Sequence, residues 1–204
     1  MTRHKQIIKL DPDFVNQKLQ EYFKEDEISE DITTKATQQT KKTVEAYFIA
    51  KESMVFAGKE IIIQGLQECK LIAIKNDGEV LKKGEIIAKI EGPADVLLKK
   101  ERVVLNLLQR LSGIASTTNR LKNKLQEHSI QLLDTRKTTP GLREFEKFAV
   151  KTGGGTNHRF SLKDAAMIKD NHLIGNPSLR DAVNNTAKQN PGKDIEVEVD
   201  TKEQ

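Results

Sequence analysis

Apolar residues near the N-terminus of the chain recur at the spacing of a helix. Asp11 and Pro12 form a favourable helix start, because an N-cap acceptor is followed by a residue whose φ is preset for the first turn. The apolar residues that follow at this spacing are Phe14, Val15, Leu19, Tyr22 and Phe23. The pattern predicts a helix that ends near Glu25.

The next part of the chain has the composition of β-strands. Residues 44–50 and 54–63 are rich in β-branched and aromatic side chains, with a break at Gly58, and predict strands with a short helix. Residues 71–92 alternate short apolar runs with turn signals, which predicts an antiparallel β unit. The turn signals are Asp77-Gly78 and Lys83-Gly84.

Helical spacing returns between Asp95 and Leu111. The apolar residues on one face are Val104, Leu107, Leu108 and Leu111, and the polar residues on another are Arg102, Asn106 and Gln109. Ser112-Gly113 is predicted to interrupt this helix, and residues 114–126 then form a second helical stretch. We place a domain boundary here, between residues 1–113 and residues 114–204.

Short apolar runs alternate with helical patterns beyond this boundary. The predicted strands are residues 130–134, 165–169 and 195–199, and the predicted helices are residues 142–151 and 179–189. Strands that alternate with helices indicate a parallel sheet or barrel, so the fold class is predicted to be α/β.

Chemically capable side chains follow these predicted strands. Asp134, Thr135, Arg136 and Lys137 come after the first, and Lys169, Asp170, Asn171 and His172 after the second. In the third, Glu196 and Glu198 share one face because side chains alternate along a strand. Each group alone is explained by solvation or capping. Their recurrence at strand ends, where α/β barrels collect active sites, indicates a functional site.

Three consecutive glycines, Gly153 to Gly155, follow the predicted helix 142–151. Gly153 can serve as its left-handed C-cap, whereas the functional interpretation is that bare backbone offers N–H groups to an anion. The pattern of a nucleotide P-loop is not present. His158 and His172 lie far apart in sequence without a nearby cysteine, so hydrogen-bonding roles are favoured over a zinc site.

The composition is that of an ordinary globular protein. Of the 204 residues, 36% are hydrophobic and 31% charged, and the net charge of +4 is spread without a long block of one sign. Nucleic-acid binding is therefore not predicted, and small anionic substrates suit the basic excess. The lone cysteine, Cys69, and the lack of a signal peptide or membrane-length apolar run favour a cytoplasmic location without membrane partners.

Three motifs together resemble the signature of quinolinate phosphoribosyltransferases. They are Asp134-Thr-Arg-Lys-Thr-Thr-Pro-Gly-Leu-Arg143, Gly153-Gly-Gly-Thr-Asn-His-Arg159 and Ile168-Lys-Asp-Asn-His172, and the likeness extends over essentially the whole chain. The resemblance implies an N-terminal α/β open-faced sandwich and dimerisation domain at 1–113, with a biotinyl- or lipoyl-like β unit, followed by an incomplete α/β barrel at 114–204. It also implies a homodimer with shared active sites, in which Arg102 reaches the site of the other subunit.

The resemblance further implies the reaction and the roles of individual residues. Quinolinate and phosphoribosyl pyrophosphate would give nicotinate mononucleotide, carbon dioxide and pyrophosphate in de novo NAD biosynthesis, with Mg²⁺ as cofactor. The implied quinolinate-binding residues are Arg136, Arg159 and Lys169, with His158 beside them. The implied catalytic residues are Lys137, which faces the phosphoribosyl donor, and Glu198, and Thr135 also binds substrate. Glu198 lies near the ribose and contacts the metal only indirectly, through the magnesium-bound pyrophosphate.

Several alternatives stay open. Family members continue through further β/α units beyond the position of Gln204, so we expect a fragment that has an open sheet edge and is prone to aggregate, and an inactive fragment is one reading. Related phosphoribosyltransferase-like proteins of molybdenum transport, or nicotinate phosphoribosyltransferases, are others, although Arg136, Arg159 and His158 favour a dicarboxylate. A biotin or lipoyl carrier is disfavoured because the hairpin lysine is missing. Higher assembly, regulation and substrate order are not predicted.

Overall fold

The computed structural model describes residues 4–125, 130–175 and 178–202. It divides into two compact units. The large unit comprises Gln6–Asp134 and Thr138–Asn157, and the small unit comprises Met1–Lys5, Thr135–Lys137 and His158–Gln204. Each unit is described by itself. No helix among the described residues is long and apolar enough to cross a membrane.

Helix α1 (Pro12–Glu25) begins where the sequence predicts it. The Asp11 side chain accepts a hydrogen bond from the Phe14 N–H at 2.9 Å, which satisfies one of the unpaired amide groups of the first turn. The side chains buried by this helix are Val15, Leu19 and Phe23. A short 3₁₀ turn (Ile28–Glu30) and helix α2 (Ile32–Thr37) follow.

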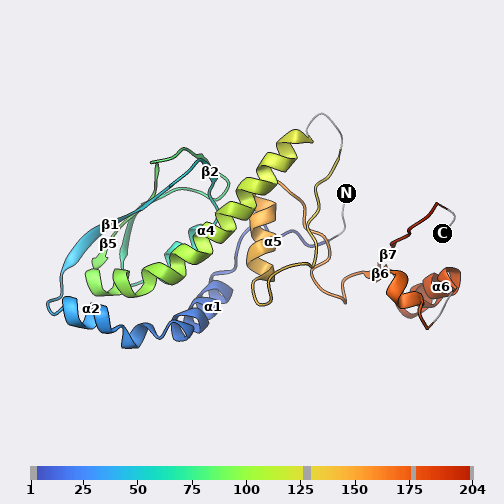
Figure 1. The fold of residues 1–204 in the computed structure, drawn as a ribbon, viewed down its shortest axis with the longest axis horizontal. Helices are drawn as coiled ribbons and strands as arrows, with labels where there is room; N and C mark the ends of the chain where they lie inside the picture. Colours follow the sequence, from blue (N-terminus) through green and yellow to red (C-terminus); the bar gives the residue numbers. More distant parts are fainter. Residues whose placement is uncertain (1–3, 126–129, 176–177, 203–204) are drawn as a thin grey trace. The chain divides into compact units, whose positions relative to one another are not determined.

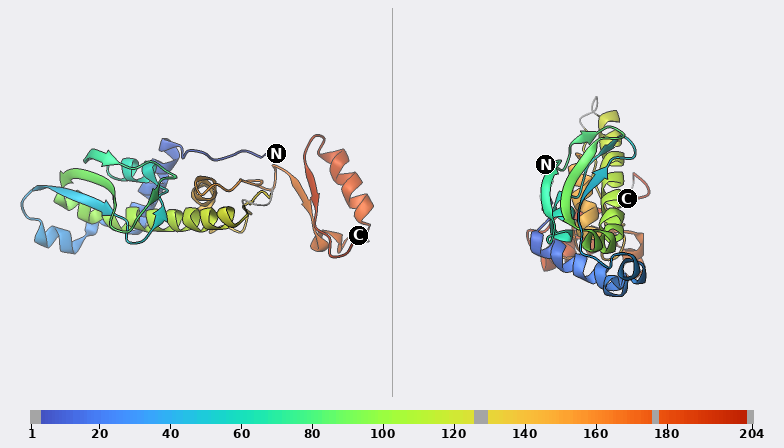
Figure 2. Two further views of the ribbon diagram at one scale, coloured as in Figure 1. Left: turned by 90° about the horizontal axis from the view of Figure 1, so that it is seen from above. Right: turned by 90° about the vertical axis from the view of Figure 1, so that its left-hand side faces the viewer.

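The large unit contains an antiparallel sheet, as predicted. Its strand order is β1 (Thr43–Ile49), β5 (Ile86–Pro93), β3 (Lys70–Ile74), and a second pair joins β2 (Met54–Val55) to β4 (Val80–Leu81). Helices α1, α3 (Lys59–Gly65) and α4 (Ala94–Lys124) pack together, and α4 runs along the sheet (Figures 1 and 2). Most residues of β1 and β3 are exposed, so the sheet has an open face.

Helix α4 (Ala94–Lys124) is one continuous helix, and the predicted interruption at Ser112-Gly113 is wrong. Ser112 is buried, and its Oγ accepts a hydrogen bond from the Ala57 N–H at 3.2 Å. A glycine inside a helix costs about 1 kcal/mol relative to alanine. Burial of the flanking Leu111 and Ala115, each 0% exposed, outweighs that cost. The predicted apolar face of this helix is confirmed as core.

The small unit contains a parallel βαβ arrangement. Strand β6 (Ala166–Ile168) pairs with β7 (Ile195–Val197), and helix α6 (Leu179–Gln189) connects them and contacts both (Figure 2). A 3₁₀ turn, η2 (Asp170–Leu173), follows β6. The α/β fold class is therefore as predicted, although both strands are shorter than the sequence indicated.

The strand predicted at residues 130–134 is reduced to a single parallel bridge between Leu133 and Thr156, and that prediction is largely wrong. The Asp134 N–H donates to the Thr156 carbonyl at 3.1 Å. The Thr156 N–H donates to the Leu132 carbonyl at 2.9 Å, and the next N–H in the chain, that of Asn157, points to the other side and donates to Gln6 Oε1 at 2.9 Å. Helix α5 (Arg143–Thr152) lies between these segments in the chain, as predicted.

Candidate functional site

The predicted site residues fall into two groups. The small unit contains Thr135, Arg136, Lys137, His158, Arg159, Lys169 and Glu198, whereas Arg102 belongs to the large unit. The structure shows which of these residues are in contact within each unit.

Lys169 and Glu198 meet at the carboxyl ends of the two parallel strands. The register pairs Ile168 with Val197, so the next residue on each strand is one of this pair. Lys169 Nζ donates to Glu198 Oε2 at 2.5 Å, and both side chains are partly exposed, at 36% and 60%. An ion pair this exposed contributes little stability, so its position at the strand ends is the more informative property.

His158 and Arg159 are buried although they lie in a loop, at 9% and 8% exposure. His158 Nε2 lies 2.5 Å from Glu196 Oε1, and Arg159 Nη1 donates to the Ala165 carbonyl at 2.7 Å. Glu196 was noted in the sequence only as sharing a face with Glu198. Its contact with His158 joins a loop to β7, and sequence spacing does not predict that contact.

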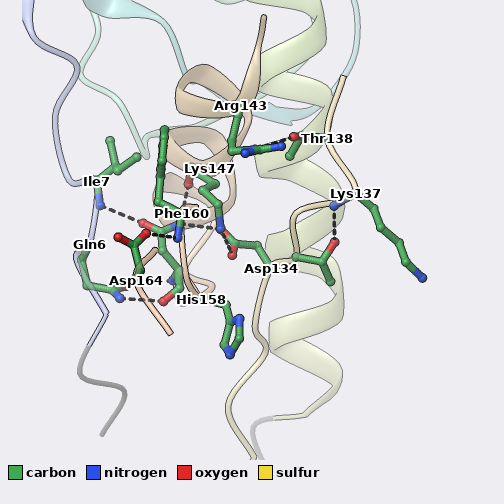
Figure 3. A network of polar contacts seen from close by, with 12 residues as sticks. Gln6, Ile7, Asp134, Lys137, Thr138, Arg143, Lys147, His158, Phe160 and Asp164 are labelled. Carbon is green, nitrogen blue, oxygen red and sulfur yellow. Dashed lines mark hydrogen bonds and ion pairs between the residues drawn. The ribbon is translucent and has the colours of Figure 1, made fainter. Parts of the chain in front are cut away.

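Thr135, Arg136 and Lys137 form a short polar turn. The Lys137 N–H donates to Thr135 Oγ1 at 3.0 Å, a local side-chain bond that fixes the backbone here. Thr135 and Lys137 are exposed, and Arg136 is half-buried. The Lys137 side chain therefore extends to where a ligand can reach it (Figure 3).

His172 has the hydrogen-bonding role expected for it. Its Nδ1 accepts from the Lys169 N–H at 3.1 Å and so closes the turn η2. This contact holds the backbone of Lys169, whose side chain reaches Glu198.

A buried polar network in the large unit was not predicted (Figure 3). Lys147 Nζ lies 2.5 Å from Asp134 Oδ1, and these side chains are 1% and 5% exposed. Asn157 Nδ2 donates both to Asp134 Oδ2, at 2.7 Å, and to the Lys147 carbonyl, at 2.8 Å. The network fixes the residues that directly precede Thr135 and His158 in the chain. Lys147 lies in a helix whose apolar spacing gave no sign of a buried charge.

The triple glycine serves helix packing, and its interpretation as an anion cradle is wrong. The N–H groups of Gly153, Gly154 and Gly155 donate to carbonyls of α5 at 3.0 Å each, so they already close the helix end. A Cβ on Gly153 would lie 2.3 Å from the Ala115 carbonyl oxygen of α4. The left-handed residue is Gly154, with φ +90°, and not Gly153 as predicted, which caps the helix with φ −72°.

Arg102 is exposed on α4 and lines a cleft of about 440 Å³ in the large unit. Other lining residues are Tyr22, Glu25, Asn106, Thr139 and Pro140. About two helical turns after Arg102, Arg110 Nε donates to Glu146 Oε1 at 2.9 Å, and the Arg110 guanidinium also donates to Thr139 Oγ1. Arg110 therefore anchors the 138–142 loop to α4, a role that the sequence did not reveal.

Charged side chains at the carboxyl ends of parallel strands, such as Lys169 and Glu198 here, are typical of the active sites of α/β enzymes. Comparison of the chain with known protein families gives a match to both domains of one family. The description "Quinolinate phosphoribosyl transferase, N-terminal domain" matches residues 31–112, and "Quinolinate phosphoribosyl transferase, C-terminal domain" matches residues 114–204. The chain belongs to the quinolinate phosphoribosyltransferase family.

Individual relatives agree with this assignment. The probable nicotinate-nucleotide pyrophosphorylase [carboxylating] of Bacillus subtilis is 46% identical over 192 residues, which are 91% of this chain and 66% of that protein. The corresponding protein of Methanothermobacter thermautotrophicus is 39% identical over 188 residues, 90% of this chain and 67% of the relative. The chain thus spans about two thirds of the length of these curated relatives.

Solved structures share the fold. The nicotinate-nucleotide pyrophosphorylase of Francisella tularensis has a TM-score of 0.90 and 33% identity, covering 98% of this chain and 72% of that one. NadC of Streptococcus pyogenes has a TM-score of 0.86 and 39% identity, covering 95% and 70%.

Proposed function

We propose that the protein to which this chain corresponds transfers a phosphoribosyl group from phosphoribosyl pyrophosphate to quinolinate, with decarboxylation to nicotinate mononucleotide. Family membership supports the proposal, and so do the names of the relatives. The observation that carries it is that the predicted cationic residues belong to the same compact unit, in which Lys169 and Glu198 are in contact at the strand ends.

Electrostatics supports an anionic pair of substrates. Quinolinate carries two carboxylates and the donor carries a phosphate and a pyrophosphate, so a site that joins them must offset their repulsion. Arg136 and Arg159 can bind carboxylates bidentately, and Lys169 adds a compact charge. Lys137 and Thr135 lie next to Arg136 in the chain and suit the phosphoribosyl donor.

In the proposed reaction the ring nitrogen of quinolinate attacks the anomeric carbon of the ribose as pyrophosphate leaves. Positive charge develops on the ribose, and the Glu198 carboxylate can stabilise it. The adjacent carboxylate then leaves as carbon dioxide, the positive pyridinium nitrogen stabilises the electron pair left on the ring carbon, and a proton from solvent adds at that carbon. No protein nucleophile is required.

We propose Mg²⁺ as the cofactor of this reaction. Glu198 is a partly exposed carboxylate, and magnesium in proteins is bound by one or two carboxylates together with substrate phosphates. Glu198 therefore suits a role beside a phosphate-bound ion. When bound, the ion neutralises charge on the departing pyrophosphate.

We also propose a homodimer with shared sites, in which residues 1–113 of each chain cover the site of the other. The exposure of Arg102 on α4 supports this arrangement. Arg102→Ala and Lys169→Ala would each inactivate a homodimer. An equal mixture should recover about a quarter of the wild-type rate, because half of the dimers are mixed and carry one intact site each. No recovery after confirmed subunit exchange would contradict the shared site.

A cytoplasmic location is part of the proposal. Cys69 is the lone cysteine of the chain and cannot form an intrachain disulfide, which fits a reducing compartment.

The direct test is carbon dioxide release from quinolinate in the presence of phosphoribosyl pyrophosphate and Mg²⁺, with circular dichroism to show that the chain is folded. Release that requires both substrates is expected. If a folded chain releases no carbon dioxide, it is an inactive fragment or acts on another substrate, and nicotinate would be tried next.

Binding tests the substrate assignment independently of turnover. Arg136→Ala should abolish quinolinate binding, measured by calorimetry, because the bidentate carboxylate contact is lost. Arg180→Ala, an exposed arginine of α6, is the matched control and should bind quinolinate as the wild type does. Unchanged affinity in Arg136→Ala would refute the assignment.

A further inference from the structure

We propose that His4, His158 and Glu196 form a binding site for a divalent transition metal, with Zn²⁺ as the expected ion. The three residues belong to the small unit, and one potential ligand atom from each lies within 4.8 Å of the others. His158 Nε2 is 2.5 Å from Glu196 Oε1. The rings of His4 and His158 meet edge to face, with centroids 4.5 Å apart and planes at 69°.

Two separate features of the chain bring these residues together. Gln6 pairs with the main chain of Asn157 through both ends of its amide, accepting from the N–H and donating to the carbonyl at 2.9 Å each. The Ile7 N–H donates to Asn157 Oδ1 at 2.7 Å. These hydrogen bonds lie two residues after His4 and one residue before His158 in the chain, and so hold the backbones of both residues near each other.

The third ligand comes from the parallel pair of strands. Glu196 is paired with Met167 in the register of β6 and β7, and this register sets which face of β7 its carboxylate occupies. The side chain is 43% exposed, whereas that of His158 is 10% exposed. The Glu196 carboxylate is therefore accessible to an ion from solvent, while the His158 imidazole lies behind it.

Ligand chemistry selects the class of metal. Two imidazoles and one carboxylate are a common ligand set for zinc, while magnesium prefers oxygen ligands alone. With metal–ligand bonds of about 2.0–2.1 Å in a tetrahedral site, ligand atoms lie about 3.4 Å apart. On binding, the wider separations, of up to 4.8 Å, must therefore shrink, and the 2.5 Å contact between His158 Nε2 and Glu196 Oε1 must lengthen. A fourth position stays open to water or a small ligand.

The histidine beside His158 is His4, which is distant from it in sequence, and not His172. His172 instead closes the turn η2 by accepting from the Lys169 N–H. The competing explanation of the cluster is a hydrogen-bonded imidazole–carboxylate pair with an aromatic edge contact, which involves no ion. Metal binding and its dependence on His4 separate these explanations.

Titration of the tag-free, metal-stripped chain with Zn²⁺ by calorimetry is the test, with Co²⁺ as a spectroscopic probe. We expect one ion per chain and a tetrahedral Co²⁺ absorption band. His4→Ala should weaken binding by more than about 100-fold, beyond the loss caused by removing an outer-shell partner. His172→Ala is the matched control and should bind as the wild type does. No binding by the folded wild-type chain, or undiminished binding by His4→Ala, would overturn the proposal.

A second measurement rests on the proposed function. His158 is one of the residues assigned to quinolinate, so bound zinc should raise the KM for quinolinate, and His4→Ala should remove this inhibition. Inhibition that persists unchanged in His4→Ala would count against the site. Metal binding by calorimetry requires no turnover, so failure of the metal site and failure of the proposed function are distinguishable.

Discussion

The residue that directly precedes Thr135, Asp134, belongs to a buried ion pair. Lys147 and Asp134 are almost fully buried and in contact, with Asn157 bonded to both. Removing one partner of such a pair leaves an uncompensated charge in a medium that solvates it poorly. The pair therefore contributes to the stability of the fold and also fixes the backbone next to residues 135–137.

Lys147→Met is expected to lower the free energy of unfolding by about 3–5 kcal/mol, because it leaves the Asp134 carboxylate buried without its cation. Urea denaturation followed by circular dichroism measures the change. Lys188→Met, at an exposed position of α6, is the matched control and should be nearly neutral. A loss below about 1 kcal/mol for Lys147→Met would show that the pair is solvated.

Asp77 is a second residue whose burial has a measurable consequence. Burial raises the pKa of its carboxyl above the ordinary value, although hydrogen bonds from the Lys59 and Gly58 N–H groups oppose this shift. A carboxyl with a raised folded pKa stabilises the fold in its protonated form. That contribution is complete below the unfolded pKa of about 3.9 and is lost as the pH rises through the folded pKa.

Asp77→Asn keeps the acceptor for both N–H groups and removes the titration. Its stability relative to the wild type should therefore rise as the pH is raised from about 4, where the wild type loses the protonated form. Urea midpoints at a series of pH values test this, with an NMR titration of the Asp77 carboxyl alongside. Parallel pH profiles for the two proteins would contradict the assignment of the shift.

Sequence reasoning at this scale identified chemical groups better than their partners. The motifs supplied Arg136, His158, Arg159, Lys169 and Glu198, and their roles stay predictions. The contact between His158 and Glu196 spans a loop and a strand, so it depends on a tertiary register that no local spacing encodes.

At the scale of elements, the packing of α5 against α4 explains the glycines between Thr152 and Thr156. A side chain on Gly153 would collide with the Ala115 carbonyl oxygen and the Thr118 side chain. The backbone of α4 cannot move aside as a flexible side chain can. The two helices can therefore lie this close only because Gly153 has no Cβ.

Gly153→Ala is expected to destabilise the protein by about 1–3 kcal/mol through overpacking. Gly113→Ala should instead stabilise it by about 0.5–1 kcal/mol, because nothing lies within 4 Å of the added Cβ and helical alanine loses less entropy than glycine on folding. Thermal unfolding of the two variants provides the comparison. Equal effects of the same sign would contradict this account.

Helices were predicted more reliably than strands in this chain. The capping of α1 by Asp11 and the bounds of α6 follow from local signals, since a helix satisfies its hydrogen bonds within itself. The segment 130–134 has the composition of a strand but pairs at Leu133 only. Whether an apolar run becomes a strand depends on a partner elsewhere, which the sequence of the run does not reveal.

At the scale of the whole molecule, burial is distributed unevenly between the two units. The large unit contains nearly all of the buried apolar residues, including Phe56, Phe145, Phe148 and Leu111, whereas Ala165 and Ile168 are those of the small unit among the described residues. Helix α6 contains no fully buried residue. Stability is therefore expected to differ between the units.

Native-state hydrogen exchange should show this difference. Amides of α4 and β5 should exchange only through large-scale unfolding, while those of α6 should exchange through smaller, local openings, because few buried contacts hold that helix. Exchange read by mass spectrometry on fragments of each element measures it. Equal protection of α4 and α6 would mean that contacts outside the described residues, or a second copy of the chain, cover α6.

The unbroken course of α4 also restricts how the length of this protein can vary. Arg102 and the turn that accommodates Gly153 lie on the same helix, and each inserted residue rotates everything after it by about 100°. One residue added between Arg102 and Ala115 would change the direction in which Arg102 points relative to the surface that packs against Gly153. An insertion in the loops on either side of the helix would not rotate one part of the helix relative to the other. Insertions and deletions among homologues should accordingly avoid this helix, and chimaeras between relatives should be joined outside it.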